Sequence, residues 1–143
     1  MSYVQLDDQI ANHPKILKAG PEAAWLWACA IAYCQNHLTD GYVTSDVLHT
    51  MPGFTAGRQR KLVERLLEAK HAGGQHGLLE RRGEDFAVHD YLDRNPSKAV
   101  VLERRRKAAE RKARERDKDT PSPRDMNGSH GVTTSVTANA TRV

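Results

Sequence analysis

The feature that most restricts the fold of this chain is a change in composition close to residue 96. Regularly spaced apolar residues occur before that point, whereas charged residues dominate the segment that follows it. Residues 1–96 contain 10 Lys and Arg against 12 Asp and Glu, a net charge of −2, and residues 97–143 contain 12 against 6, a net charge of +6. The core must therefore come from about the first 95 residues, which suffice for one modest domain.

Two longer helices are predicted in this first part. Over residues 21–37, apolar residues recur at three- and four-residue spacing, which predicts a central helix with Trp25 in the core. Trp27 is expected to be either half exposed or covered by the N-terminal segment. The segment 56–70 forms a second helix with one apolar face, made by Leu62, Val63, Leu66 and Leu67.

Turn and capping residues predict shorter elements around these helices. They are a short strand over residues 3–6, a short helix that begins at Pro14, a strand at 42–43, a short helix capped by Thr44 or Ser45, a cap at Thr55, and strands at 77–82 and 86–89. Helix, strand, two helices and two strands in this order predict a winged helix-turn-helix domain, mainly α with a small β-hairpin (α+β). The expected organisation is a winged-helix domain over 1–95, a basic helical arm over 96–118 and a disordered polar tail over 119–143.

The basic arm concentrates the positive charge. Its segment Lys98 to Lys118 contains 10 Lys and Arg against 4 Asp and Glu, and Ser97 can cap the helix. Such an asymmetry favours a polyanionic partner, and the alternative is a solvated helix that only raises solubility. If the partner is DNA, we expect phosphate contacts from Arg104, Arg105, Arg106, Lys107, Arg111 and Lys112.

The helix 56–70 is the expected recognition helix, since the second helix of such a motif enters the major groove. With its apolar face inward, four polar side chains are expected to point outward and contact DNA: Arg58, Gln59, Lys61 and Arg65. Two further contacts are expected at the wing from Arg81 and Arg82, although Glu80, Glu84 and Asp85 beside them would be repelled by phosphate. The alternative for both sets is an ordinary solvated surface.

Other classes of function find little support in the sequence. No phosphate-binding glycine loop and no nucleophile elbow occurs, so we expect no enzyme activity and no cofactor. Cys29 and Cys34 lie five apart in one predicted helix, where they are expected to fill the core rather than form a disulfide. Cys34 and His37 have metal-ligand spacing, but a structural zinc site needs a second pair of ligands, so no metal is expected. No apolar run is long enough to span a membrane, and no signal peptide is evident, so a cytoplasmic location is expected.

Several segments resemble a group of phage and prophage proteins of actinobacteria. These segments are Tyr3 to Leu6, His13 to Lys15, Trp27 to Cys34, Leu38 to Gly41 and His89 to Ser97. The relatives are described as replication-initiation or replisome-organiser-like winged-helix proteins, similar in arrangement to the DnaD N-terminal domain, and the likeness covers about residues 3–106.

The resemblance implies origin binding or support of helicase loading in phage DNA replication, without catalysis. Its partners would be duplex DNA and either replication proteins or a second copy of the chain, with no membrane. Replisome organisers often carry a second domain that engages a helicase or its loader, and the short polar tail here does not resemble one. The alternative is a protein-interaction or transcription-regulatory module with the same fold. RNA recognition lacks a visible aromatic platform.

Overall fold

The computed structural model describes residues 3–120 of the chain, and the predicted polar tail beyond residue 120 lies outside the described residues. The chain divides into a compact unit that ends at Arg104 and a second unit that begins at Arg105. The first unit therefore extends beyond the predicted domain boundary at residue 95. Among the described residues, no helix is both long and apolar enough to cross a membrane.

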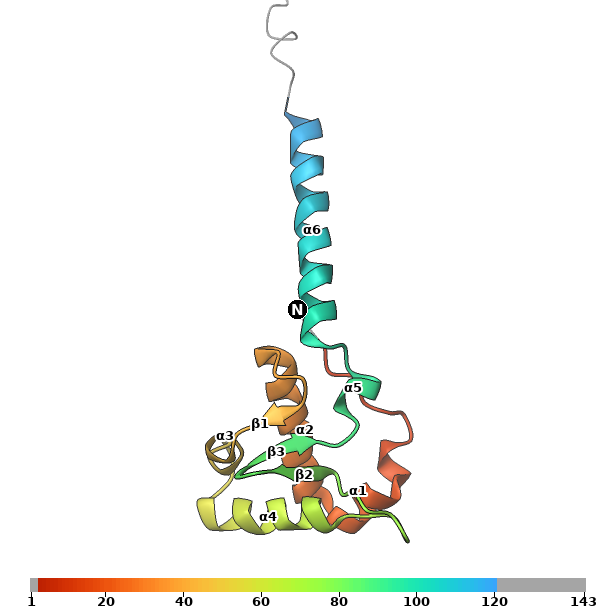
Figure 1. The fold of residues 1–143 in the computed structure, drawn as a ribbon, viewed down its shortest axis with the longest axis vertical. Helices are drawn as coiled ribbons and strands as arrows, with labels where there is room; N and C mark the ends of the chain where they lie inside the picture. Colours follow the sequence, from red (N-terminus) through yellow and green to blue (C-terminus); the bar gives the residue numbers. More distant parts are fainter. Residues whose placement is uncertain (1–2, 121–143) are drawn as a thin grey trace, which may run out of the picture. The chain divides into compact units, whose positions relative to one another are not determined.

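The structure is mainly helical with a small antiparallel sheet, which confirms the predicted α+β class (Figure 1). Along the described residues its elements are a 3-10 helix η1 (Ile10–Asn12), α1 (Pro14–Ala19), α2 (Pro21–His37), β1 (Tyr42–Val43), α3 (Ser45–His49), α4 (Ala56–Glu68), β2 (Leu79–Arg82), β3 (Asp85–Val88), α5 (Tyr91–Arg94) and α6 (Lys98–Asp119).

The described strands form one sheet in the order β1-β3-β2, so the last strand lies between the other two. Tyr42 pairs with Ala87 between β1 and β3, and Leu79 pairs with Val88 in the β2–β3 hairpin. β1 precedes α3 and α4 in sequence and β3 follows them. The pairing of β1 with β3 therefore joins the two ends of this helical segment.

The core of the first unit lies where α2, α3 and α4 meet the sheet. In Figure 1, α4 runs along the lower edge of this unit with the hairpin directly above it. The largest fully buried apolar side chains come from each of these elements: Leu26, Cys34, Val43, Leu48, Leu62, Leu66 and Leu79. The predicted apolar face of α4 is confirmed at Leu62, Val63 and Leu66, while Leu67 is partly buried at its edge.

The prediction for Trp25 is wrong, because its side chain is 63% exposed. The buried positions of α2 include Ala23, Leu26 and Ala30, which are three and four residues apart. Leu26, the residue after Trp25, therefore takes the core position that was predicted for Trp25. Trp27 packs against the core while staying partly exposed, as expected. Of the two thiols predicted to fill the core, Cys34 is buried and Cys29 is half-buried.

The ends of the helices follow the capping predictions only in part. Thr44 occupies the cap of α3, where its hydroxyl oxygen accepts a hydrogen bond from the backbone N–H of Val47 at 3.4 Å. Thr55 holds the capping position of α4 but makes no side-chain capping bond. The strand predicted for residues 3–6 is absent from the described residues, and α5 was not predicted.

The first turn of α6 belongs to the first unit. The backbone N–H of Lys98 donates a 2.6 Å hydrogen bond to Oδ1 of Asp40, and Oγ of Ser97 accepts one from Val100. Val101 is only 9% exposed. The helix starts at the predicted residue, but its beginning is anchored by Asp40 and by burial of Val101, two contacts that helix propensity does not reveal.

Candidate nucleic-acid interface

The exposed face of α4 carries more cations than carboxylates. Because Leu62, Val63 and Leu66 point into the core, the opposite side of the helix is exposed, and it carries Arg58, Arg60, Lys61, Glu64, Arg65 and Glu68. Arg58, Lys61 and Arg65 are three and four residues apart, so they form one stripe along the helix surface. Arg60 was not predicted as a DNA contact. Its position between the apolar positions of the helical repeat could have placed it on the exposed side of the helix.

Gln59 does not belong to this face, and its expected outward orientation is wrong. Its side chain is 1% exposed, and its amide nitrogen donates a 2.7 Å hydrogen bond to the carbonyl oxygen of Met51. Gln59 lies three and four residues before Leu62 and Val63, which places it on the buried side of the helix. A side chain in this position cannot reach the edge of a base.

Arg58 lies at the start of the stripe and is already paired. Its Nε and Nη2 donate to the two carboxylate oxygens of Glu22 on α2, and both side chains are exposed. The hydrogen bond from Arg58 lowers the pKa of Glu22, and the same bond raises the pKa of Arg58. A phosphate would therefore compete with Glu22 for this guanidinium. No ion pair of Arg60, Lys61 or Arg65 occurs within residues 3–120.

The two arginines of the hairpin are also engaged. The guanidinium of Arg81 lies over the ring of Phe86, 5.6 Å from its centroid. Arg82 pairs with Glu80 through Nη2 and Oε2 at 2.8 Å. The turn between them and β3 is made by Gly83, whose φ of 65° suits glycine. Both arginines keep their charge at the surface, yet Glu80 offsets that of Arg82.

The expected cations of the basic arm fall in both units. Arg104 ends the first unit, whereas Arg105, Arg106, Lys107, Arg111 and Lys112 belong to the second. All six side chains are exposed on α6, and Arg106 forms an ion pair with Glu110 one helical turn on. The segment of α6 after Arg104 is a strongly basic, solvated helix without a buried face, as its composition predicts.

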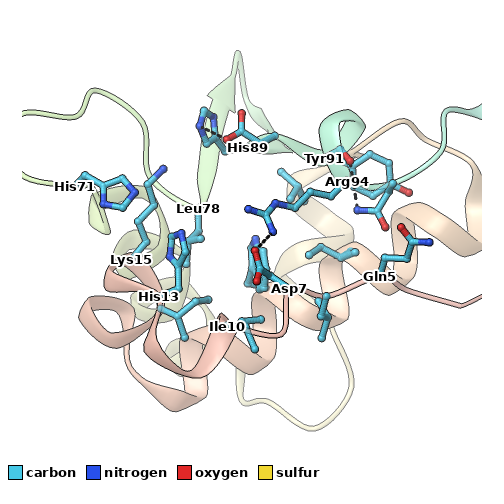
Figure 2. A pocket seen from close by; sticks show the side chains of 17 residues that line it. Gln5, Asp7, Ile10, His13, Lys15, His71, Leu78, His89, Tyr91 and Arg94 are labelled. Carbon is cyan, nitrogen blue, oxygen red and sulfur yellow. Dashed lines mark hydrogen bonds and ion pairs between the residues drawn. The ribbon is translucent and has the colours of Figure 1, made fainter.

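A polar pocket lies elsewhere on the first unit, beside η1, α1 and α5 (Figure 2). Its cavity of about 280 Å³ is lined by side chains from distant segments of the chain. Figure 2 shows Lys15, His13 and His71 along one side, with the ion pair of Asp7 and Arg94 facing them. The Nζ of Lys15 donates to the carbonyl oxygen of Gly77 at 3.4 Å.

The pocket contains buried polar atoms that lack a hydrogen-bond partner among the described residues. These are Nδ1 of His13, Nε1 of Trp27 and Oδ1 of Asn95. Burial lowers the pKa of His13, and the hydrogen bond from Arg94 lowers the pKa of Asp7 from 3.8 to about 2. The cavity is polar and wide enough for ordered water, which would satisfy these atoms.

Comparison with protein-family models finds no match to the chain, and comparisons with curated proteins and with solved structures find none either. The resemblance to phage replication proteins therefore stays a prediction.

Proposed function

We propose that the first unit is a winged-helix domain that binds duplex DNA with α4, without catalysis. The observation that carries this proposal is the stripe of cations on the exposed face of α4, the helix directly before the β2–β3 hairpin. In a winged helix, this helix is the one that enters the major groove. Lys61 and Arg65 are the cations of the stripe best placed to bind phosphates or base edges.

The topology supports the fold part of the proposal. A winged helix has the order helix, strand, helix, helix, strand, strand, with the last strand in the middle of the sheet. The segment from α2 to β3 has this order, and its strands are arranged β1-β3-β2. The hairpin then corresponds to the wing, with Arg81 and Arg82 near its turn.

Arg58 and the cations of α6 have different roles in this proposal. Arg58 must leave Glu22 to bind a phosphate, so it contributes less than Lys61 or Arg65. The arm of α6 adds cations that bind the backbone without reading sequence, and each phosphate contact steepens the salt dependence of log Kd by about 0.9. The resemblance found in the sequence extends the proposal to initiation of phage DNA replication.

The test is binding of a fluorescent duplex, followed by anisotropy over a salt series. The full chain is compared with the double variant Lys61→Ala/Arg65→Ala. We expect Kd to rise about tenfold or more and the salt slope to fall by about two, with an unchanged thermal midpoint. The matched control is Lys18→Ala/Lys70→Ala, which removes the same charge from exposed positions outside the stripe.

The control decides what the result means. An equal loss of affinity in both double variants would show attraction by net charge alone and would overturn the assignment of α4. No binding by the full chain at low salt would overturn DNA binding altogether.

A protein partner is the second candidate function, and the exposure of Trp25 favours it. Tryptophan is enriched at protein interfaces, and the side chain of Trp25 is 63% exposed. If the duplex does not bind, we expect the chain to bind a protein instead, and Trp25→Ala would be the first variant to examine.

A further inference from the structure

Three potential metal ligands meet at the base of the β2–β3 hairpin. Glu80 pairs with Ala87 across the hairpin, and His89 follows Ala87 by two residues, so both side chains lie on the same face of the sheet. His76 comes from the loop before β2, four residues ahead of Glu80. The sequence predicts the two strands but not their register, and the meeting of Glu80 and His89 depends on that register.

The three potential ligand atoms are close enough to share one small cation after modest side-chain adjustment. Nδ1 of His76 lies 3.3 Å from Oε1 of Glu80, and Nδ1 of His89 contacts the same oxygen. All three atoms lie within 4.8 Å of one another. Ligands at zinc bond lengths of about 2.0–2.1 Å in a tetrahedral site are roughly 3.3 Å apart. The imidazole rings are stacked, with centroids 4.9 Å apart, and both Nδ1 atoms face Oε1 of Glu80.

The surroundings orient the ligand atoms. Nε2 of His89 lies 3.0 Å from Oδ2 of Asp90, which holds the ring with its Nδ1 atom towards Glu80. Arg82 holds the other oxygen of Glu80 at 2.8 Å, which leaves Oε1 for the centre.

Nδ1 of His76, Nδ1 of His89 and Oε1 of Glu80 converge at one place. A proton can join one pair of them, whereas a metal ion can bind all three. We propose that His76, Glu80 and His89 bind a divalent metal ion of the zinc type, with solvent completing the coordination. Two imidazoles and one carboxylate suit such an ion. Asp90 acts as a positioning residue, since a carboxylate on the far nitrogen of a ligating histidine fixes the ring and its tautomer.

The ion would join the loop before β2 to the end of β3. His76 is the most exposed of the three ligands, and its anchoring would order the loop that follows α4. Because metal binds the folded chain and the unfolded chain has no such site, its binding also stabilises the fold.

The experiment uses the full chain after treatment with a chelator. Zn²⁺ is titrated calorimetrically at pH 7.5, and the thermal midpoint is measured with and without the ion. We expect one tight Zn²⁺ per chain and a higher midpoint when it is bound. His76→Ala should lose this site and the rise in midpoint, and Asp90→Asn should weaken binding about 10- to 100-fold.

The control variant is His37→Ala, which removes an exposed histidine at the end of α2, outside the cluster. It should bind Zn²⁺ as the unmodified chain does. Equal Zn²⁺ binding by His76→Ala and His37→Ala would overturn the proposal, as would no binding at millimolar Zn²⁺. Because His76 is largely exposed, its variant should fold, which the midpoint without metal verifies.

Discussion

The side chain of Gln59 bridges the turn between α3 and α4 by donating a 2.7 Å hydrogen bond to the carbonyl oxygen of Met51. Both residues are buried, so this bond provides a donor for a carbonyl oxygen in a part of the core with little access to water. It joins the beginning of α4 to the segment that follows α3. The bond therefore sets where the cation stripe of α4 begins relative to the rest of the core.

Replacing Gln59 by Leu should lower stability without weakening DNA binding by the folded protein. The Met51 carbonyl would lose its donor, at a cost of about 1–3 kcal/mol in the free energy of unfolding. Urea denaturation measures this cost, and the exposed Gln75→Leu serves as control, with a change within about 0.5 kcal/mol. A large loss of DNA affinity at unchanged stability would place the Gln59 amide at the surface instead.

Gln59 also shows how far the sequence can specify this structure. The helical repeat that places Leu62 and Val63 inside also places Gln59 inside, but its polar type suggested an outward position. On α2 the apolar residues surround the helix, so the repeat could not decide between burial of Trp25 and of Leu26. The element order depends on local turn and capping residues, and for that reason it was predictable.

The sites that depend on distant contacts were not predictable in the same way. Asp7 and Arg94 are 87 residues apart and meet in the pocket. Glu80 and His89 meet because of the hairpin register. Neither contact leaves a periodic pattern in the sequence, so residue type alone could mark these side chains only as separate polar groups.

Gly77 should tolerate no side chain, because the chain passes close to the end of α4 there. A Cβ at this position would lie 2.4 Å from the carbonyl oxygens of Leu66 and Leu67, and Leu78 fixes the approach by donating to Leu66 at 2.9 Å. We expect Gly77→Ala to destabilise the fold by about 1–3 kcal/mol in urea denaturation.

The matched control is Gly57→Ala on α4, where a Cβ would meet no atom within 4 Å. Alanine restricts the unfolded chain and favours the helix, so this variant should gain up to about 0.5–1 kcal/mol. Similar effects of the two substitutions would contradict the close approach at Gly77.

The pair of Asp7 and Arg94 should make stability depend on acid. The hydrogen bond from Arg94 lowers the pKa of Asp7 from 3.8 to about 2 in the folded protein. Since the folded value lies below the unfolded one, the contribution is complete above pH 3.8 and is lost as the pH falls towards 2. Thermal midpoints from pH 6 to pH 2 should show Arg94→Gln below the unmodified chain at pH 6 and converging with it in acid. Arg60→Gln, which removes an exposed arginine for which the described residues provide no ion pair, should show no such convergence.

Val101 should contribute to the stability of the first unit although it lies in the basic helix. Its side chain is 9% exposed, whereas that of its neighbour Val100 is 42% exposed. Val101→Ala should therefore lower the free energy of unfolding by roughly 1–2 kcal/mol, the value of two buried methyl groups, and Val100→Ala should change it by less than about 0.5 kcal/mol. Urea denaturation of the full chain measures both. Equal effects would mean that the first turn of α6 is as solvated as the rest of the basic helix, and a chain ending at residue 95 would then be as stable as one ending at Arg104.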